Sequence, residues 1–158
     1  MVPAYAATPA ATQQTTQASV SVTGWRLECD PGKTTLACHA LDQIVSSTNG
    51  AQILGFNVTP ATDGKTVFAI SVPLGSSLRT PIGVSVVGGP SQSFTFLACS
   101  QQSCVATGVV NEDLLTAMRA GKSELRVTYD LLDNGLTEHQ LTASLPLTGF
   151  GEVYDRLK

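Results

Sequence analysis

Hydrophobic and polar residues alternate along most of the chain from residue 19 onward. A period of two predicts β-strands in which one face is buried. Turn signals of Gly, Pro, Asn and Asp separate the alternating runs, as in proteins made of many short antiparallel strands. The clearest candidates before residue 100 are SVSVTGWRLEC (19–29), TLACHALDQIV (35–45), AQILGFNVT (51–59), KTVFAISVP (65–73), Ile82 to Val87, and SQSFTFLAC (91–99).

One segment, NEDLLTAMRAGKS (111–123), has a helical pattern instead. Asn111 is a suitable N-cap, two acids follow it, and Leu114, Leu115 and Met118 fall on one face of a helix. Gly121 is the residue type that favours a helix end. The sequence therefore predicts a short helix near residues 111–120.

Glycine-containing pairs predict two hairpins. Asp63-Gly64 lies between two strand candidates, and Asn134-Gly135 separates SELRVTYDLL from LTEHQLTASLPL. In the second of these, His139, Leu141, Ala143 and Leu145 share one face. The C-terminal GFGEVYDRLK predicts a short helix or an ordered tail.

About eight strands and one helix predict an antiparallel, Ig-like β-sandwich as a single domain over residues 19–158. The arrangement of Cys, Trp and Cys that pins true immunoglobulin domains is missing. Residues 1–18 are rich in Ala, Thr, Gln and Pro and lack charge, and Ala4-Tyr5-Ala6 has the small-x-small form of a signal-peptidase site. We interpret 1–18 as a signal-peptide remnant or a disordered linker.

Composition narrows the function classes. Charged residues make up 13% of the 158-residue chain, against roughly 25% in average soluble proteins, and the formal net charge is -3. This charge gives no basic face for nucleic acid. No apolar run approaches the length of about 18 residues that a membrane-spanning helix needs. The composition favours an extracytoplasmic β protein.

The four cysteines, Cys29, Cys38, Cys99 and Cys104, allow three disulfide pairings. Redox motifs have two residues between their cysteines, whereas these pairs have eight and four. Zinc sites favour close cysteine pairs, typically two to four residues apart, so the spacing fits zinc poorly as well, although His39 beside Cys38 keeps a metal site open. TFLAC-SQQS-CVATG has the pattern of strand, turn and strand, which would place Cys99 opposite Cys104. We predict disulfides 29–38 and 99–104, and hence an oxidising compartment.

Catalytic chemistry has little support in the sequence. Hydrolase, zinc-protease, phosphate-loop and calcium-loop motifs are missing. His39 and His139 lie on strand candidates and are expected to be structural or surface residues. Trp25 is expected in the core near a disulfide, with carbohydrate stacking as the alternative. We expect no enzyme, no cofactor and no metal, although a carboxylate pair could still assemble in three dimensions.

A set of ordered motifs resembles the invasion-associated locus B family of bacterial extracytoplasmic proteins. The set runs from Gly24-Trp25 through the cysteines, PLG (73–75) and AGK (120–122) to SLPLTGFGEVYDRL (144–157). The resemblance covers nearly all of the expected domain. It implies an exported, disulfide-bonded β-sandwich in the periplasm, at the outer membrane or secreted, without an established catalytic activity, in a family named for host-cell entry.

The leading hypothesis is an exported, non-enzymatic envelope or surface protein that presents a binding face to a protein or to an envelope or host-surface component. Recognition residues often lie on loops of rigid sandwiches. The segment between Leu74 and Ile82 is the expected contact loop, exposing Ser76, Ser77, Arg79 and Thr80; the alternative is that it merely connects two sheets. The other functions left open are a periplasmic accessory or chaperone-like module and a small-molecule or glycan binder.

Overall fold

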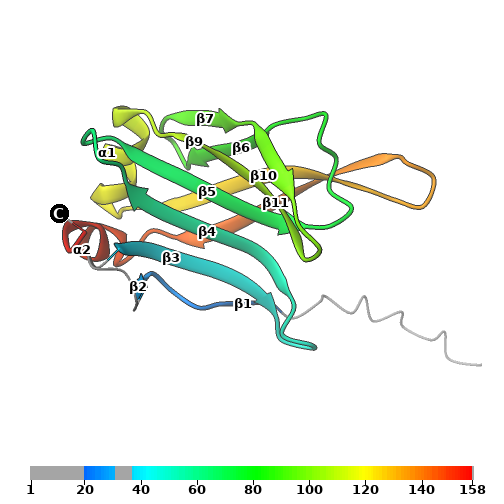
Figure 1. Cartoon of the computed structure of the whole chain (residues 1–158), viewed down its shortest axis with the longest axis horizontal. Coiled ribbons are helices and arrows are strands. Elements are labelled where there is room, and N and C mark those ends of the chain that lie inside the picture. Colours follow the sequence, from blue (N-terminus) through cyan, green and yellow to red (C-terminus); the bar gives the residue numbers. More distant parts are fainter. Residues whose placement is uncertain (1–19, 31–36, 158) are drawn as a thin grey trace, which may run out of the picture.

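The computed structural model describes residues 20–30 and 37–157, which form two antiparallel sheets packed face to face with two short helices at one end (Figure 1). This confirms the predicted all-β sandwich. The predicted tail 1–18, and residues 19, 35 and 36 of two predicted strands, lie outside the described residues. The elements are β1 (Val20–Val22), β2 (Arg26–Asp30), β3 (Ala37–Ser46), β4 (Gln52–Pro60), β5 (Thr66–Pro73), β6 (Ile82–Val86), β7 (Ser91–Phe94), β8 (Phe96–Cys99), β9 (Ser103–Val109), α1 (Glu112–Ala120), β10 (Glu124–Leu132), β11 (Glu138–Pro146) and α2 (Phe150–Asp155).

The larger sheet has seven strands in the order β1-β3-β4-β5-β9-β8, and β2 pairs with the half of β3 that β1 leaves free. The smaller sheet has the order β11-β10-β6-β7. Alternate residues of β5 and β6 are buried, as expected for strands that turn one face to a core and the other outward. The period-two pattern of the sequence therefore marks the inner faces of the two sheets.

Two predicted strands are each divided in the structure. The described part of the predicted strand 19–29 forms β1 and β2, which are separated at Gly24, whose φ of 84° takes the backbone out of the extended region. Residues 91–99 form β7 and β8, separated at Thr95, because the chain crosses there from the smaller to the larger sheet. The structure thus has eleven strands among the described residues, where the sequence indicated about eight.

A row of aromatic rings runs through the core and joins the sheets. Trp25 meets Phe56 edge-on at a centroid distance of 5.9 Å, Phe56 meets Phe68 at 4.9 Å, and Phe68 meets Phe94 of the smaller sheet at 5.5 Å. Such pairs add about 0.5–1.5 kcal/mol each beyond the burial of their area. Phe56, Phe68 and Phe94 are almost completely buried.

Helix α1 confirms the predicted helix and buries its three apolar residues. Gly121 ends it in the left-handed conformation, with φ of 65°. Asn111 occupies the N-cap position without a side-chain cap, and its N–H instead donates to Gln92 Oε1 at 2.8 Å. Helix α2 packs beside α1, and the Arg119 guanidinium bonds the Asp155 carboxylate at 2.8 Å. The helices close one end of the sandwich.

Both predicted glycine turns form, one at Asp63-Gly64 between β4 and β5 and the other at Asn134-Gly135 between β10 and β11. Gly64 takes φ of 80° in the turn between β4 and β5. Between β10 and β11, Asn134 and Gly135 are the central residues of a turn closed by the Leu136 N–H, which donates to the Asp133 carbonyl at 2.9 Å. The positive φ, 60°, follows at Leu136. Asp133 Oδ1 accepts the N–H groups of Gly135 and Thr137, both at 2.9 Å, so its carboxylate stabilises this turn.

Candidate functional site

The sandwich is closed along the side where β7 continues into β8. Gln92 of β7 reaches the other sheet, where its Nε2 donates to the Val109 carbonyl of β9 at 2.7 Å. Its Oε1 accepts the Asn111 N–H. Chain connectivity and these bonds hold the sheets together on this side.

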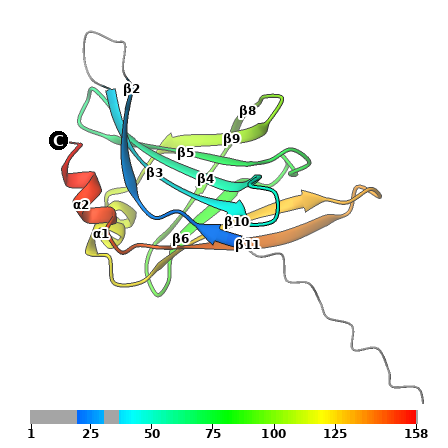
Figure 2. The same ribbon diagram turned by 90° about the horizontal axis from the view of Figure 1, so that it is seen from below.

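On the opposite side the two sheets end in the edge strands β1 and β11 (Figure 2). A cleft of about 390 Å³ lies there, between the inner faces of the two sheets. Its walls come from β1, β3 and β4 on one side and from β10 and β11 on the other, and none of the lining side chains is charged. The lining residues are Val22, Ile44, Ile53, Tyr129, Leu141, Thr142, Ala143 and Ser144.

The cleft has the size and the lining that are typical of binding sites. Small-molecule and side-chain pockets measure roughly 300–1,000 Å³ and are mostly apolar with a few polar groups. Here the inward polar side chain is Tyr129, whose hydroxyl donates to the Ile53 carbonyl at 3.4 Å. Burial raises the pKa of the Tyr129 phenol, which therefore stays neutral. The arrangement suits an uncharged, apolar occupant.

The backbone of β11 points half of its polar groups away from the sandwich. The Asp133 N–H donates to the Thr137 carbonyl and the Leu147 N–H to the Ser123 carbonyl, so these two pairs bond directly. Leu125 is opposite Leu145 in the same register, and bonded pairs alternate along an antiparallel ladder. Odd-numbered residues of β11 therefore bond β10, and even-numbered residues direct their N–H and C=O groups outward.

Trp25 covers one end of this outward-facing row. Its indole Nε1 donates to the carbonyl of Pro146, an even-numbered residue, at 2.8 Å. Its ring packs against Phe150, with a centroid distance of 4.7 Å, as well as against Phe56. Trp25 is a structural residue in this arrangement, as expected from the sequence, and it marks where the open side of the sandwich closes.

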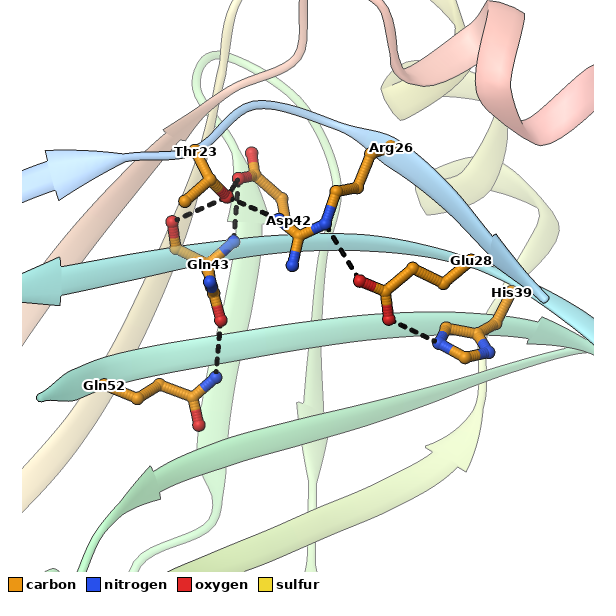
Figure 3. Close-up of polar contacts among 7 residues, drawn as sticks. All are labelled: Thr23, Arg26, Glu28, His39, Asp42, Gln43 and Gln52. Carbon is orange, nitrogen blue, oxygen red and sulfur yellow. Dashed lines mark hydrogen bonds and ion pairs between the residues drawn. The ribbon is translucent and has the colours of Figure 1, made fainter. Parts of the chain in front are cut away.

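Near the break between β1 and β2 lies a buried carboxyl group that sequence analysis missed. Asp42 is fully buried on β3, and its Oδ1 accepts the Gln43 N–H at 2.7 Å and the Thr23 hydroxyl at 3.3 Å (Figure 3). Its Oδ2 has no partner among the described residues. Burial raises the pKa of Asp42, against hydrogen bonds from Gln43 and Thr23 that lower it. The only sequence signal was a charge at an inward position of an alternating strand.

The two disulfides lie near opposite edges of the seven-stranded sheet. Cys29 joins Cys38 across β2 and β3, and Cys99 joins Cys104 across β8 and β9. In each case the joined residues are direct partners in the antiparallel register. The pairing is the one that the spacing favoured.

The expected contact loop is exposed only in part. Two of the four residues that were predicted at its surface are buried, so the prediction is wrong for these two. Ser76 and Ser77 are 6% and 1% exposed. The Ser77 hydroxyl donates to the Glu138 carboxylate at 2.5 Å, and its N–H donates to the Asp130 carbonyl at 2.7 Å. These bonds to the β10–β11 hairpin anchor the loop. Arg79 and Thr80 are exposed, as expected.

Each of the two histidines lies beside one carboxylate. His39 Nε2 is 3.6 Å from Glu28 Oε2, and His139 Nε2 is 2.9 Å from Asp133 Oδ2. Hydrogen bonding to His139 lowers the pKa of Asp133. Within residues 20–30 and 37–157, no group of three or more His, Cys, Asp or Glu residues could hold a metal ion. The same residues contain no helix with the length and hydropathy of a membrane span.

Comparison with known proteins places the fold in a family. The crystal structure of invasion associated protein B from Bartonella henselae matches with a TM-score of 0.72 and 23% sequence identity, covering 84% of this chain and 89% of that chain. No curated protein matches the sequence. The sequence model of the invasion associated locus B (IalB) protein family matches residues 25–158. The chain therefore belongs to the invasion associated locus B family.

Proposed function

We propose that this protein is exported from the bacterial cytoplasm and serves in the envelope or at the cell surface as a non-enzymatic binding module. Export is supported by the Cys29–Cys38 and Cys99–Cys104 disulfides, since such bonds persist mainly in oxidising compartments. The name of the solved Bartonella relative, an invasion associated protein, supports a partner at the host-cell surface.

The cleft between β1 and β11 is the observation on which the binding role rests. It is apolar, it opens to solvent between two sheet edges, and it has the volume of a ligand site. The lining contains neither a carboxylate pair nor a nucleophile beside a base, which favours recognition over chemistry. Arg79 and Thr80 are exposed on the loop after β5 and form a second, polar candidate contact.

Photo-crosslinking in intact producing cells tests the role of the cleft. A photoreactive amino acid at Leu141 would report on the cleft, and the same group at Val87 is the matched control. Leu141 and Val87 are 40% and 39% exposed. We expect adducts to envelope or host components from position 141 and none from position 87. Equal labelling from both positions, or none from Leu141, would contradict the proposal.

Protease accessibility tests the compartment. Cleavage on intact cells would support surface display and a partner on host cells. Protection that is lost when the outer membrane is permeabilised would support a periplasmic accessory role. Protection that persists until the inner membrane is broken would contradict export altogether.

The volume of the cleft also supports a second candidate function, the binding of a small apolar molecule. A ligand that binds only the folded protein raises its melting temperature with ligand concentration. Thermal unfolding against a series of fatty acids and aromatic compounds tests this, with Ala143→Glu as the variant that places a charge in the cleft. The same shift in Ala143→Glu would show that such ligands bind elsewhere.

A further inference from the structure

The sheet edges of this protein are unequally protected against pairing with another chain. Unpaired edges are normally shortened, bulged, charged or covered. Strand β8 has four residues, an irregular register and a disulfide. Strand β1 has only three residues, β2 holds charged residues and a disulfide, and β7 is joined to β9 through Gln92. Each of these four edges is obstructed.

Strand β11 has none of these protections along most of its length. It has nine residues in an unbroken register with β10, without a bulge or lysine, and its only proline is the last residue, Pro146. Its one acidic residue, Glu138, is bonded to Ser77. The outward N–H and C=O groups of Gln140, Thr142 and Ser144 have no hydrogen-bond partner among the described residues, and all three residues are exposed.

We propose that an extended segment of a partner protein adds to β11 as a fifth strand of the smaller sheet. This inference rests on the proposed binding function and names the form in which the partner binds. Gln140, Thr142 and Ser144 would supply the backbone hydrogen bonds. In strand addition these bonds provide affinity, and pockets for alternate side chains provide specificity.

The cleft determines the side-chain pattern of that segment. An added strand lies about 4.8 Å from β11, and its alternate side chains face the same side as Leu141 and Ala143. Those two residues line the uncharged cleft, so the inward residues of the segment are apolar. The opposite face of β11 is polar and exposed at Thr142 and Ser144, so the outward residues are polar. The segment alternates apolar and polar residues.

A second copy of this chain fits the edge less well. Antiparallel pairing of β11 with itself, centred on Leu141, would set His139 of one copy opposite Ala143 of the other. His139 is hydrogen-bonded to Asp133, and burying these polar groups at an apolar mouth costs free energy. A heterologous partner avoids this cost.

The test uses a displayed library of random peptides with the nine-residue length of β11. The purified full chain is the target. Thr142→Pro removes one outward N–H and places a ring on the edge, while the ladder to β10 stays intact; Gln140→Pro repeats the block two residues away. The matched control is Ser93→Pro on β7. The Val86 N–H donates to the Pro90 carbonyl, and Ser85 is opposite Ser91 in the same register. Because bonded pairs alternate along an antiparallel ladder, even-numbered residues of β7 bond β6 and the Ser93 N–H points outward.

We expect enriched peptides to alternate apolar and polar residues and to bind Ser93→Pro as they bind the original chain. Thr142→Pro and Gln140→Pro should each weaken binding about tenfold or more, as expected when hydrogen bonds are lost and one edge is blocked. N-methylation of one alternate set of peptide nitrogens should abolish binding, and methylation of the other set should not.

Three results would overturn strand addition at β11: enrichment of no alternating peptide, unchanged affinity for both proline variants, or a dimer of the full chain that Thr142→Pro dissociates. The last result would identify a second copy as the occupant. Because the assay uses purified protein, its failure leaves the cellular crosslinking and protease experiments free to support the proposed function. Peptide binding without crosslinking from Leu141 would instead refute the cellular role alone.

Discussion

The edge strands of the seven-stranded sheet are short or crosslinked, whereas the four-stranded sheet ends on one side in β11, whose outer edge pairs with no other strand among the described residues. Disulfides join β2 to β3 and β8 to β9, close to the two edges of the larger sheet. The smaller sheet has no disulfide among its described residues, and the apolar cleft lies beside its open edge. The difference indicates a rigid scaffold in the larger sheet and a receptive edge in the smaller one.

Removing the indole of Trp25 should have the largest effect, because this ring links the larger sheet to Pro146 at the end of the open edge. We expect Trp25→Ala to reduce the free energy of unfolding by about 3 kcal/mol, near the low end for buried aromatics since the ring is half-buried. Trp25→Phe should cost about 1 kcal/mol. Urea unfolding followed by circular dichroism measures both. Equal losses would mean that the ring contributes little packing.

Removing one disulfide at a time tests whether the larger sheet is held at both edges. Cys29→Ala with Cys38→Ala, and Cys99→Ala with Cys104→Ala, should each lower the free energy of unfolding by about 2–3 kcal/mol, given the short loops they close. The bonds lie at opposite edges, so the two losses should add to within about 0.5 kcal/mol. Chemical unfolding of these two variants and of the variant that combines all four substitutions measures this, and strong non-additivity would show that the two edges are coupled.

Neighbouring proline substitutions in β11 test which backbone groups are free. Leu141→Pro removes an N–H that bonds β10 and leaves a carbonyl of β10 without its partner. We expect it to lower the free energy of unfolding by about 1–3 kcal/mol. Thr142→Pro removes an outward N–H and should cost less than about 1 kcal/mol. Thermal unfolding distinguishes them. If Thr142→Pro were the less stable variant, the odd-numbered residues of β11 would be the ones whose N–H groups point outward, which would contradict the assignment.

The smallest effect concerns Asp42, whose raised pKa has a defined sign in the pH dependence of folding. The folded state holds this proton more tightly than the unfolded state, whose pKa is near 3.8. Stability from this group is therefore present at low pH and is lost as the pH rises from about 3.8 through the raised folded value.

Asp42→Asn removes this dependence while an amide oxygen can still accept the Thr23 and Gln43 bonds. The stability of the variant relative to the original chain should therefore be greater at pH 7 than at pH 3. Melting temperatures across this range measure the difference. A difference that is independent of pH would show that Asp42 titrates alike in both states.

The features predicted correctly from the sequence depend on nearby residues. The disulfide partners lie nine and five positions apart. Helix α1 is predicted by its own apolar face and by Gly121 at its end. The alternation of hydrophobic and polar residues with a period of two predicts the inner faces of the strands, because burial alternates from one residue to the next along a strand. Local patterns were sufficient for these elements.

The features missed depend on contacts between distant residues. Ser77 was expected at the surface, but its partner Glu138 lies 61 positions away. Thr95 interrupts no local pattern, yet the chain changes sheets there because β8 pairs with β9. The cleft combines five strands, so no single stretch of sequence indicates it. Strand order, and with it the open edge, is a property of the whole fold.

Residue-resolved amide hydrogen exchange of β11 tests the open edge most directly, in the free full-length chain. The account predicts alternation: the N–H groups of Gln140, Thr142 and Ser144 exchange fast, and those of Leu141 and Ala143, which bond β10, exchange slowly. Slow exchange at all five positions would show that the edge is already covered, and fast exchange at all five would show that β11 is not held in the sheet. Either result would contradict a receptive edge on a rigid scaffold.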